Sequence, residues 1–169
     1  MFRGHTISAG IGVFEAPDGS TFERDLVHHP GAVSVVPVVE EGTAVLLVRQ
    51  FRAAIDRDLL EVPAGTCDVE GERPEQTAHR ELAEEVGMRA GRMEWLCEFQ
   101  NSPGFCDEHS WIYLALDLEP AAISRQGVEE QHMTIEKVSL DDVPSMIADG
   151  RITDAKTIIG LMLTREKLA

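Results

Sequence analysis

Short apolar, β-branched runs separated by polar turns dominate this chain and predict a fold rich in strands. Ala32–Val39 is almost entirely apolar, and a second apolar run follows at Ala44–Phe51, after Glu40-Glu41-Gly42. Apolar runs of about four to eight residues that are bounded by a tight turn are typical of buried strands. Leu59–Gly65 is expected to be a short strand that ends in a bend at Pro63-Ala64-Gly65, and further strands are expected at Trp95–Phe99, Trp111–Leu116 and Met133–Val138.

Two stretches have the period of a helix instead. In the first, which begins at Pro74 and ends at Gly87, apolar residues recur every four positions and form a stripe that a core could bury. The stripe consists of Ala78, Leu82 and Val86. The second stretch runs from Ala155 to about Lys167. The chain is therefore expected to form a mixed sheet with helices on its faces.

The N-terminal segment predicts a β-hairpin that precedes the main core. Its arms are Gly4–Phe14 and Thr21–His28, and Ala16-Pro17-Asp18-Gly19 supplies a turn. The first arm carries apolar residues that a lone hairpin cannot bury, namely Ile7, Ile11, Val13 and Phe14. A second subunit could cover this face, or the hairpin could fold back over its own sheet.

Composition narrows the classes of partner. A formal net charge of -15 argues against nucleic acid, because phosphate backbones are bound by clustered Lys and Arg. Three cysteines, an odd number without paired zinc spacing, are expected to be reduced thiols. No signal peptide or membrane span is expected, so the predicted location is the cytoplasm. The chain, 169 residues long, suits a single main domain.

Carboxylates are concentrated on the first predicted helix. Glu81, Glu84 and Glu85 are spaced so that they share one face and repel one another. A hard divalent cation such as Mg²⁺ takes oxygen ligands and would relieve this repulsion. The alternative is a solvated acidic face, with His79 and Arg80 softening the repulsion.

These residues resemble the signature of the Nudix hydrolases: Gly, five residues, Glu, seven residues, then Arg-Glu-aliphatic-any-Glu-Glu-any-Gly-aliphatic. The segment from Glu72 to Met88 matches it at each fixed position, whereas six residues separate Gly65 from Glu72. Loops accommodate one extra residue at small cost. The resemblance implies an α/β/α sandwich over residues 29–169, with residues 1–28 as a hairpin extension used for dimerisation.

The resemblance extends to the ADP-ribose pyrophosphatase branch of that family. It is carried by Arg49-Gln50-Phe51-Arg52, Leu60–Gly65, Ser102–Glu108, Val138–Asp142 and Thr153–Thr157. It implies hydrolysis of ADP-ribose to AMP and ribose 5-phosphate. Another nucleoside diphosphate sugar, such as GDP-mannose, is an alternative substrate. A sensor that binds ADP-ribose without hydrolysing it is an alternative from another functional class.

The branch also implies roles for individual residues. Mg²⁺, or Mn²⁺, would be held by Glu81, Glu85 and the carbonyl of Ala64, with Glu84 as a further ligand or a catalytic orienter. The substrate would be contacted by Arg52 at the diphosphate, by Glu61 at the nucleoside or ribose, and by Gly104 and Phe22. Glu72 is expected to anchor the loop. The dimer is expected to exchange its N-terminal strands, so that Phe14 or Phe22 lines the partner's pocket.

The general base is expected on the loop Gly127–His132. The resemblance leaves Glu129 or Glu130 for this role, with His132 as a third candidate. The other histidines lack metal-ligand spacing and are expected to be polar groups at strand ends; they include His28, His29 and His109.

Overall fold

The computed structural model describes residues 1–123 and 131–169. Within these residues, seven strands form one mixed sheet. Its main path runs through β10 (Thr134–Ser139), β5 (Ala44–Arg52), β4 (Ala32–Val39), β9 (His109–Pro120) and β8 (Met88–Gln100). β4 and β9 are parallel, and the other pairs are antiparallel. The predicted mixed sheet is confirmed.

Two further short strands lie off the main path of this sheet. β6 (Arg57–Glu61) pairs with the end of β5, whereas β7 (Ala64–Thr66) pairs with the first residues of β4. The chain therefore crosses from the strand beside β5 to the strand beside β4 within two residues, Val62 and Pro63. The short strand expected before Pro63 is β6, whereas Ala64 and Gly65, expected to belong to a bend, begin the further strand β7. The crossing between the two strands brings Ala64 beside the first helix.

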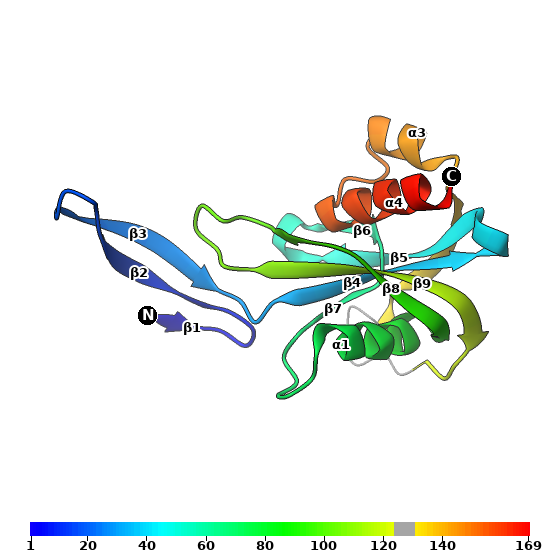
Figure 1. Ribbon diagram of the computed structural model, residues 1–169, viewed down its shortest axis with the longest axis horizontal. Coiled ribbons are helices and arrows are strands. Elements are labelled where there is room, and N and C mark those ends of the chain that lie inside the picture. Colours follow the sequence, from blue (N-terminus) through cyan, green and yellow to red (C-terminus); the bar gives the residue numbers. More distant parts are fainter. Residues whose placement is uncertain (124–130) are drawn as a thin grey trace.

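Helices cover both faces of the sheet (Figure 1). α1 (Pro74–Glu81) and the π-helical turn η3 (Leu82–Val86) lie on one face, while α3 (Val143–Ala148) and α4 (Ala155–Leu168) lie on the other. Alternate residues of β4 enter the two cores, because successive side chains of a strand point to opposite faces. Val33 and Val35 pack with α1, and Val36 and Val38 belong to the core on the other face. The expected α/β/α sandwich is confirmed.

The helix with the acidic face begins and ends as its sequence predicts. Pro74 occupies the first turn, and the backbone N–H of Arg73 donates to the side chain of Gln76 at 3.0 Å. Gly87 ends the segment with a φ of 70°, a conformation that glycine adopts without strain. The predicted stripe of Ala78, Leu82 and Val86 is buried.

The N-terminal hairpin forms its own sheet and extends away from the sandwich (Figure 1). It consists of β1 (Phe2–Arg3), β2 (Ser8–Glu15) and β3 (Thr21–His28). At its base, the N–H of Val27 donates to the carbonyl of Phe105 at 2.7 Å, and the N–H of Asp107 donates to the carbonyl of Val27 at 3.1 Å. The hairpin therefore does not cover its own main sheet.

Several boundaries differ from those expected. β8 is longer than the predicted Trp95–Phe99, and the ordered first arm of the hairpin begins at Ser8 rather than Gly4. The short helix α3 was not predicted, because six residues are too few to show a repeating apolar stripe. Of the described helices, none is long and apolar enough to cross a membrane.

Candidate active site

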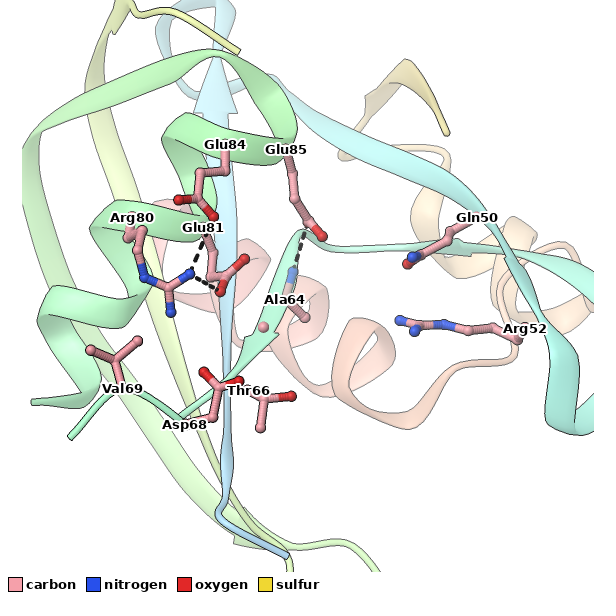
Figure 2. A pocket seen from close by; sticks show the side chains of 11 residues that line it. Gln50, Arg52, Ala64, Thr66, Asp68, Val69, Arg80, Glu81, Glu84 and Glu85 are labelled. Atoms are coloured by element: carbon pink, nitrogen blue, oxygen red, sulfur yellow. Dashed lines mark hydrogen bonds and ion pairs between the residues drawn. The ribbon is translucent and has the colours of Figure 1, made fainter. Parts of the chain in front are cut away.

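The acidic residues of α1 and η3 line a cavity of about 460 Å³ beside β7 (Figure 2). Glu81 and Glu85 are 7% and 3% exposed, so neither is a solvated surface acid. Glu81 ends the α-helical part, while Glu84 and Glu85 lie in the π-helical turn. The cavity is lined by Gln50, Arg52, Ala64, Gly65, Thr66, Asp68, Val69, Arg80, Glu81, Glu84 and Glu85.

Arg80 lies among these acids. Its Nη1 donates to Oε1 of Glu81 at 2.6 Å and to Oε2 of Glu84 at 3.2 Å, and its Nη2 donates to Glu72 at 3.2 Å. Burial opposes the charge of Arg80, but its hydrogen bonds to Glu72 and the charge of Glu81 outweigh this and raise the pKa of the guanidinium. Arg80 therefore offsets part of the repulsion among the acids, as the alternative of an acidic surface face also expected. That alternative required solvated acids, however, and Glu81 and Glu85 are buried.

The absence of a side chain at Gly65 leaves room for the Glu81 carboxylate. A Cβ on Gly65 would lie 2.0 Å from both Cδ and Oε1 of Glu81. No side chain larger than hydrogen fits between the strand and this carboxylate. On the same strand, the N–H of Ala64 donates to Oε2 of Glu85 at 3.1 Å. Two buried carboxylates are thus held against the backbone of β7.

This donor set fits a hard divalent cation. Carboxylate and carbonyl oxygens are the ligands that Mg²⁺ prefers, and Ala64, Glu81, Glu84 and Glu85 all line the same cavity. Across the part of the chain that the structure describes, no three His, Cys, Asp or Glu side chains already form a closed cage. Glu81 and Glu84 are instead bridged by Nη1 of Arg80.

The opposite side of the cavity is formed by β5. Gln50 and Arg52 lie there, across from Arg80 (Figure 2). Arg52 binds Glu61 through two parallel hydrogen bonds, Nε to Oε1 at 2.8 Å and Nη2 to Oε2 at 2.5 Å. These bonds with Glu61, opposed by burial, raise the pKa of Arg52. Glu61 itself is 1% exposed and lies beneath the cavity wall.

A second cavity of about 390 Å³ adjoins the first. The two share Arg52, Ala64, Gly65 and Thr66. The other lining residues are mostly polar: His29, Ala32, Asn101, Glu108, Ser110, Asp154 and Lys156. Arg52 therefore stands at the boundary between a space lined by the acids and a space lined by hydrogen-bonding groups.

Phe22 and Gly104 come together, but at a different place. They line a more apolar cavity of about 410 Å³ between the hairpin and the loop after β8, together with Phe14, Pro103 and Phe105. Phe14 and Phe22 stack with ring centroids 5.6 Å apart. Neither Phe22 nor Gly104 lines the two cavities beside α1.

The remaining expected residues have varied surroundings. Glu72 accepts from Thr77 at 3.0 Å as well as from Arg80, and so ties the loop to α1. His28 contacts Asp107 at 2.7 Å, and His29 Nδ1 accepts from the N–H of Gly31 at 3.1 Å. The candidate bases Glu129 and Glu130 lie outside the described residues.

Sequence reasoning assigned no role to Gln50, Asp68, Asp154 or Lys156, which all line the two cavities. For Gln50, the alternation along β5 was a usable signal, because Gln50 and Arg52 point to the same side of a strand. Asp154 and Lys156 come from the start of α4, about 100 residues further along. No local pattern connects them with Arg52.

Residues 28–159 match the NUDIX domain. The chain belongs to the Nudix family. An ADP-ribose pyrophosphatase of Bacillus subtilis (strain 168) is 36% identical over 100% of this chain and 90% of its own length. A second ADP-ribose pyrophosphatase, from Mycobacterium tuberculosis, is 36% identical over 86% of this chain and 70% of its own. The predicted resemblance to this branch of Nudix hydrolases is confirmed.

Two further relatives extend the comparison. A protein of Bacillus methanolicus described as a methanol dehydrogenase activator is 35% identical over 95% of this chain and 86% of its own. The crystal structure of an ADP compounds hydrolase matches this Nudix chain with a TM-score of 0.85 and 23% identity. The match covers 99% of this chain and 89% of the other, so the two share their fold. Nudix hydrolases generally use divalent metals such as Mg²⁺.

Proposed function

We propose that this Nudix hydrolase cleaves the diphosphate of ADP-ribose to AMP and ribose 5-phosphate. The observation that carries the proposal is the pairing of buried Glu81 and Glu85 with Arg52 across one cavity. The diphosphate of a nucleoside diphosphate sugar is anionic and binds together with a divalent cation. The carboxylates of this cavity can hold the cation, and Arg52 can pair with the diphosphate. The two related ADP-ribose pyrophosphatases support the choice of ADP-ribose.

Glu81, Glu85, the carbonyl of Ala64 and Glu84 would hold Mg²⁺ or Mn²⁺. The cation would supply charge neutralisation and polarisation of the phosphoryl oxygens. Arg52 binds the diphosphate from the opposite side, because a guanidinium pairs well with phosphate oxygens. Arg80 bridges Glu81 and Glu84 through Nη1 and holds both carboxylates in place.

Glu129 or Glu130 acts as the general base that takes a proton from the attacking water. These acids precede β10 in the sequence, in the segment where the related branch is expected to carry its base. His132 is the third candidate, and it is an exposed residue.

The enzyme acts as a homodimer through its N-terminal hairpin, residues 1–28. Ile11 and Val13 are 67% and 66% exposed in the single chain, and Phe2 is 65% exposed. Apolar residues gathered on a hairpin that stands away from its own core favour a protein interface. Phe22 and Gly104 would then bind substrate in a pocket completed by the partner. Three free thiols support a cytoplasmic location.

A second candidate is the hydrolysis of another nucleoside diphosphate sugar. A GDP-mannose pyrophosphatase of Enterobacter sp. (strain 638) is 28% identical over 81% of this chain. Its identity is lower than that of the ADP-ribose pyrophosphatases, which places GDP-mannose second.

A substrate panel tests the proposal. Purified protein with Mg²⁺ is incubated with ADP-ribose, GDP-mannose and other nucleotide sugars, and products are separated by chromatography. The expected result is AMP and ribose 5-phosphate from ADP-ribose, with the highest kcat/KM of the panel. Higher kcat/KM for GDP-mannose would favour the second candidate. Tight binding of ADP-ribose without release of AMP would identify a sensor instead of an enzyme.

A further inference from the structure

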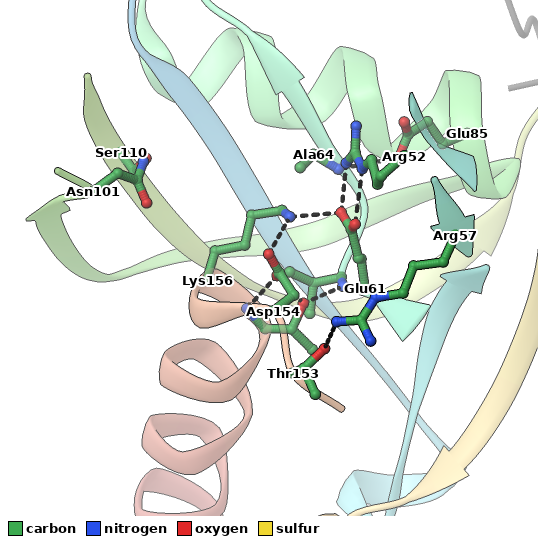
Figure 3. Close-up of polar contacts among 12 residues, drawn as sticks. Arg52, Arg57, Glu61, Ala64, Glu85, Asn101, Ser110, Thr153, Asp154 and Lys156 are labelled. Carbon is green, nitrogen blue, oxygen red and sulfur yellow. Dashed lines mark hydrogen bonds and ion pairs between the residues drawn. The ribbon is translucent and has the colours of Figure 1, made fainter. Parts of the chain in front are cut away.

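Glu61 is a buried carboxylate that receives three charged donors. Arg52 occupies it with Nε and Nη2, and Nζ of Lys156 donates to Oε2 at 2.6 Å (Figure 3). Glu61 is 1% exposed, so its oxygens serve these two cations rather than a molecule in the cavity. Because Arg52 uses the Nε and Nη2 edge for Glu61, its Nη1 edge is turned away from that carboxylate.

Lys156 is itself held firmly in place. Its Nζ lies 2.9 Å from Oδ1 of Asp154, and its side chain is 17% exposed. Asp154 caps α4 by accepting from the N–H and the hydroxyl of Thr157, at 2.9 and 2.6 Å. The same Thr157 hydroxyl accepts from the N–H of Val62 at 2.9 Å. The start of α4 is thereby fixed to the chain crossing that leads from Glu61 to Ala64.

The four charged groups alternate in sign from Arg52 through Glu61 and Lys156 to Asp154 (Figure 3). Burial opposes ionisation of Glu61, but hydrogen bonds from Arg52 and the charge of Lys156 outweigh it and keep the pKa of Glu61 below its ordinary value. Without Lys156, the Arg52–Glu61 pair would keep its attraction but lose the group that fixes the carboxylate. The pair would then be able to swing toward solvent, since Arg52 is 37% exposed.

We propose that Lys156 is a positioning residue, which fixes Glu61 and through it holds Arg52 at the boundary between the two cavities. The consequence is a guanidinium that is already in place when a diphosphate arrives, so little ordering is needed on binding. The inference rests on the proposed function for the role of Arg52 toward diphosphate. The ordering of Arg52, however, is a property of the free protein.

The first test therefore uses the free protein. Exchange of the Arg52 Nε–H with solvent is measured by NMR in wild type, K156M and K156R, with R52M to assign the signal. In K156M the exchange should be faster by about tenfold or more, and K156R should restore slow exchange by keeping a charged donor. Unchanged exchange in K156M would overturn the inference. If K156M does not fold, K156Q replaces it, because it retains an amide donor without the charge.

The second test separates positioning from direct contact, because Lys156 also lines the second cavity. Binding of an ADP-ribose analogue with a methylene bridge in its diphosphate is measured by calorimetry in wild type, R52M, K156M and the double variant. K156M should weaken binding about tenfold in wild type and less than about twofold in R52M, because its effect passes through Arg52. Equal losses in both backgrounds would show direct action on the ligand and overturn positioning.

Steady-state kinetics and a matched control complete the design. K156M should raise KM more than it lowers kcat, because Arg52 binds the diphosphate in the ground state as well. K137M is the control, since Lys137 forms an exposed ion pair with Glu40 away from both cavities, and it should leave exchange and affinity unchanged. A wild type that lacks hydrolytic activity would overturn the proposed function, while the exchange measurement would still decide the positioning role.

Discussion

The two walls of the candidate active-site cavity have opposite electrostatic arrangements. On the helix wall, formed by α1 and η3, the single guanidinium of Arg80 serves Glu72, Glu81 and Glu84. On the strand wall, at the end of β5, Arg52 shares the single carboxylate of Glu61 with Lys156 of α4. Of the residues lining the first cavity, four are acidic and two are basic. The helix wall is therefore short of positive charge, whereas on the strand wall Asp154 pairs with Lys156 and balances the second cation.

This difference predicts opposite consequences of neutralising a carboxylate. On the helix wall, removal of one charge relieves repulsion, so function should fall while the metal-free fold is unaffected or gains stability. On the strand wall, removal of the Glu61 charge leaves two buried or half-buried cations without their shared partner, which is costly. Activity and stability should thus separate on one wall and fall together on the other.

The largest expected effect comes from Glu81→Gln and Glu85→Gln. Each should lower kcat by about a thousandfold or more at saturating Mg²⁺, because an oxygen ligand of the cation is lost. The melting temperature without metal should be equal to or slightly above that of wild type. Activity and melting are measured on the same preparations, together with Mn²⁺ affinity by electron paramagnetic resonance.

Glu75→Gln is the matched control for this wall. Glu75 lies on the same helix but is exposed and outside the cavity. Its substitution should leave kcat and Mn²⁺ affinity near wild type. Turnover within about tenfold of wild type for both Glu81→Gln and Glu85→Gln would refute the cation site, since loss of a ligand must cost more than that.

The next effect concerns the candidate general base. Either Glu129→Gln or Glu130→Gln, but not both equally, should lower kcat by about a hundredfold or more, in the range typical of general bases. Metal and substrate affinities should stay unchanged, because a base acts mainly in the transition state. Steady-state kinetics and calorimetry check both points. If neither variant changes kcat, the loop is not catalytic.

Gly65→Ala tests how closely the helix wall approaches β7. The added Cβ would overlap the Glu81 carboxylate and should displace it, with a loss of about a hundredfold in kcat and weaker Mn²⁺ binding. The shorter side chain of Glu81→Asp should recover part of this loss in the Gly65→Ala background. Equal cost of Glu81→Asp in both backgrounds would show that the overlap is not the cause.

Deletion of residues 1–28 tests whether substrate binding depends on a second subunit. The truncated chain should be a monomer by light scattering, with KM raised about tenfold, because an exposed apolar face and the Phe22 pocket are lost together. A change in KM much larger than the change in kcat is expected, since the helix wall stays intact. A truncated protein that keeps both the oligomeric state and the KM of the full-length chain would contradict the shared pocket.

The two walls also differ in how far sequence could predict them. The helix wall follows from local spacing: Glu81, Glu84 and Glu85 share a helical face, and Gly87 ends the segment. The π-helical turn was not predicted, because the spacing of the acids fits a continuous α-helix equally well. On the strand wall, Lys156 contacts Glu61 from 95 positions further along the chain, and such a contact exists only after the sheet and α4 have packed.

The fold shows the same contrast between local and distant information. β4 and β5 were predicted from apolar runs, and the break at Pro63 was predicted as well, but β7 was missed because Ala64 and Gly65 were assigned to the bend. Pro63 supplies the break, since a proline cannot donate to a sheet ladder. The direction in which the hairpin leaves the sandwich depends on the contacts of Val27 with the loop after β8, which no pattern within residues 1–28 encodes.

The smallest and most discriminating effect is the pH dependence of stability on the strand wall. The pKa of Glu61 is lowered in the folded state, although burial opposes this, by its bonds with Arg52 and the charge of Lys156. A carboxylate with a lowered folded pKa adds stability above its unfolded pKa, and this is lost as pH falls through the folded value. Glu61→Gln should therefore melt below wild type at pH 7, and the gap should narrow progressively as the pH falls below about 4.3, the ordinary pKa of glutamate. Glu81→Gln, measured alongside, should show no destabilisation at pH 7. A gap for Glu61→Gln that stays constant from neutral to acid pH would mean that packing of Glu61, rather than its charge, holds the strand wall together.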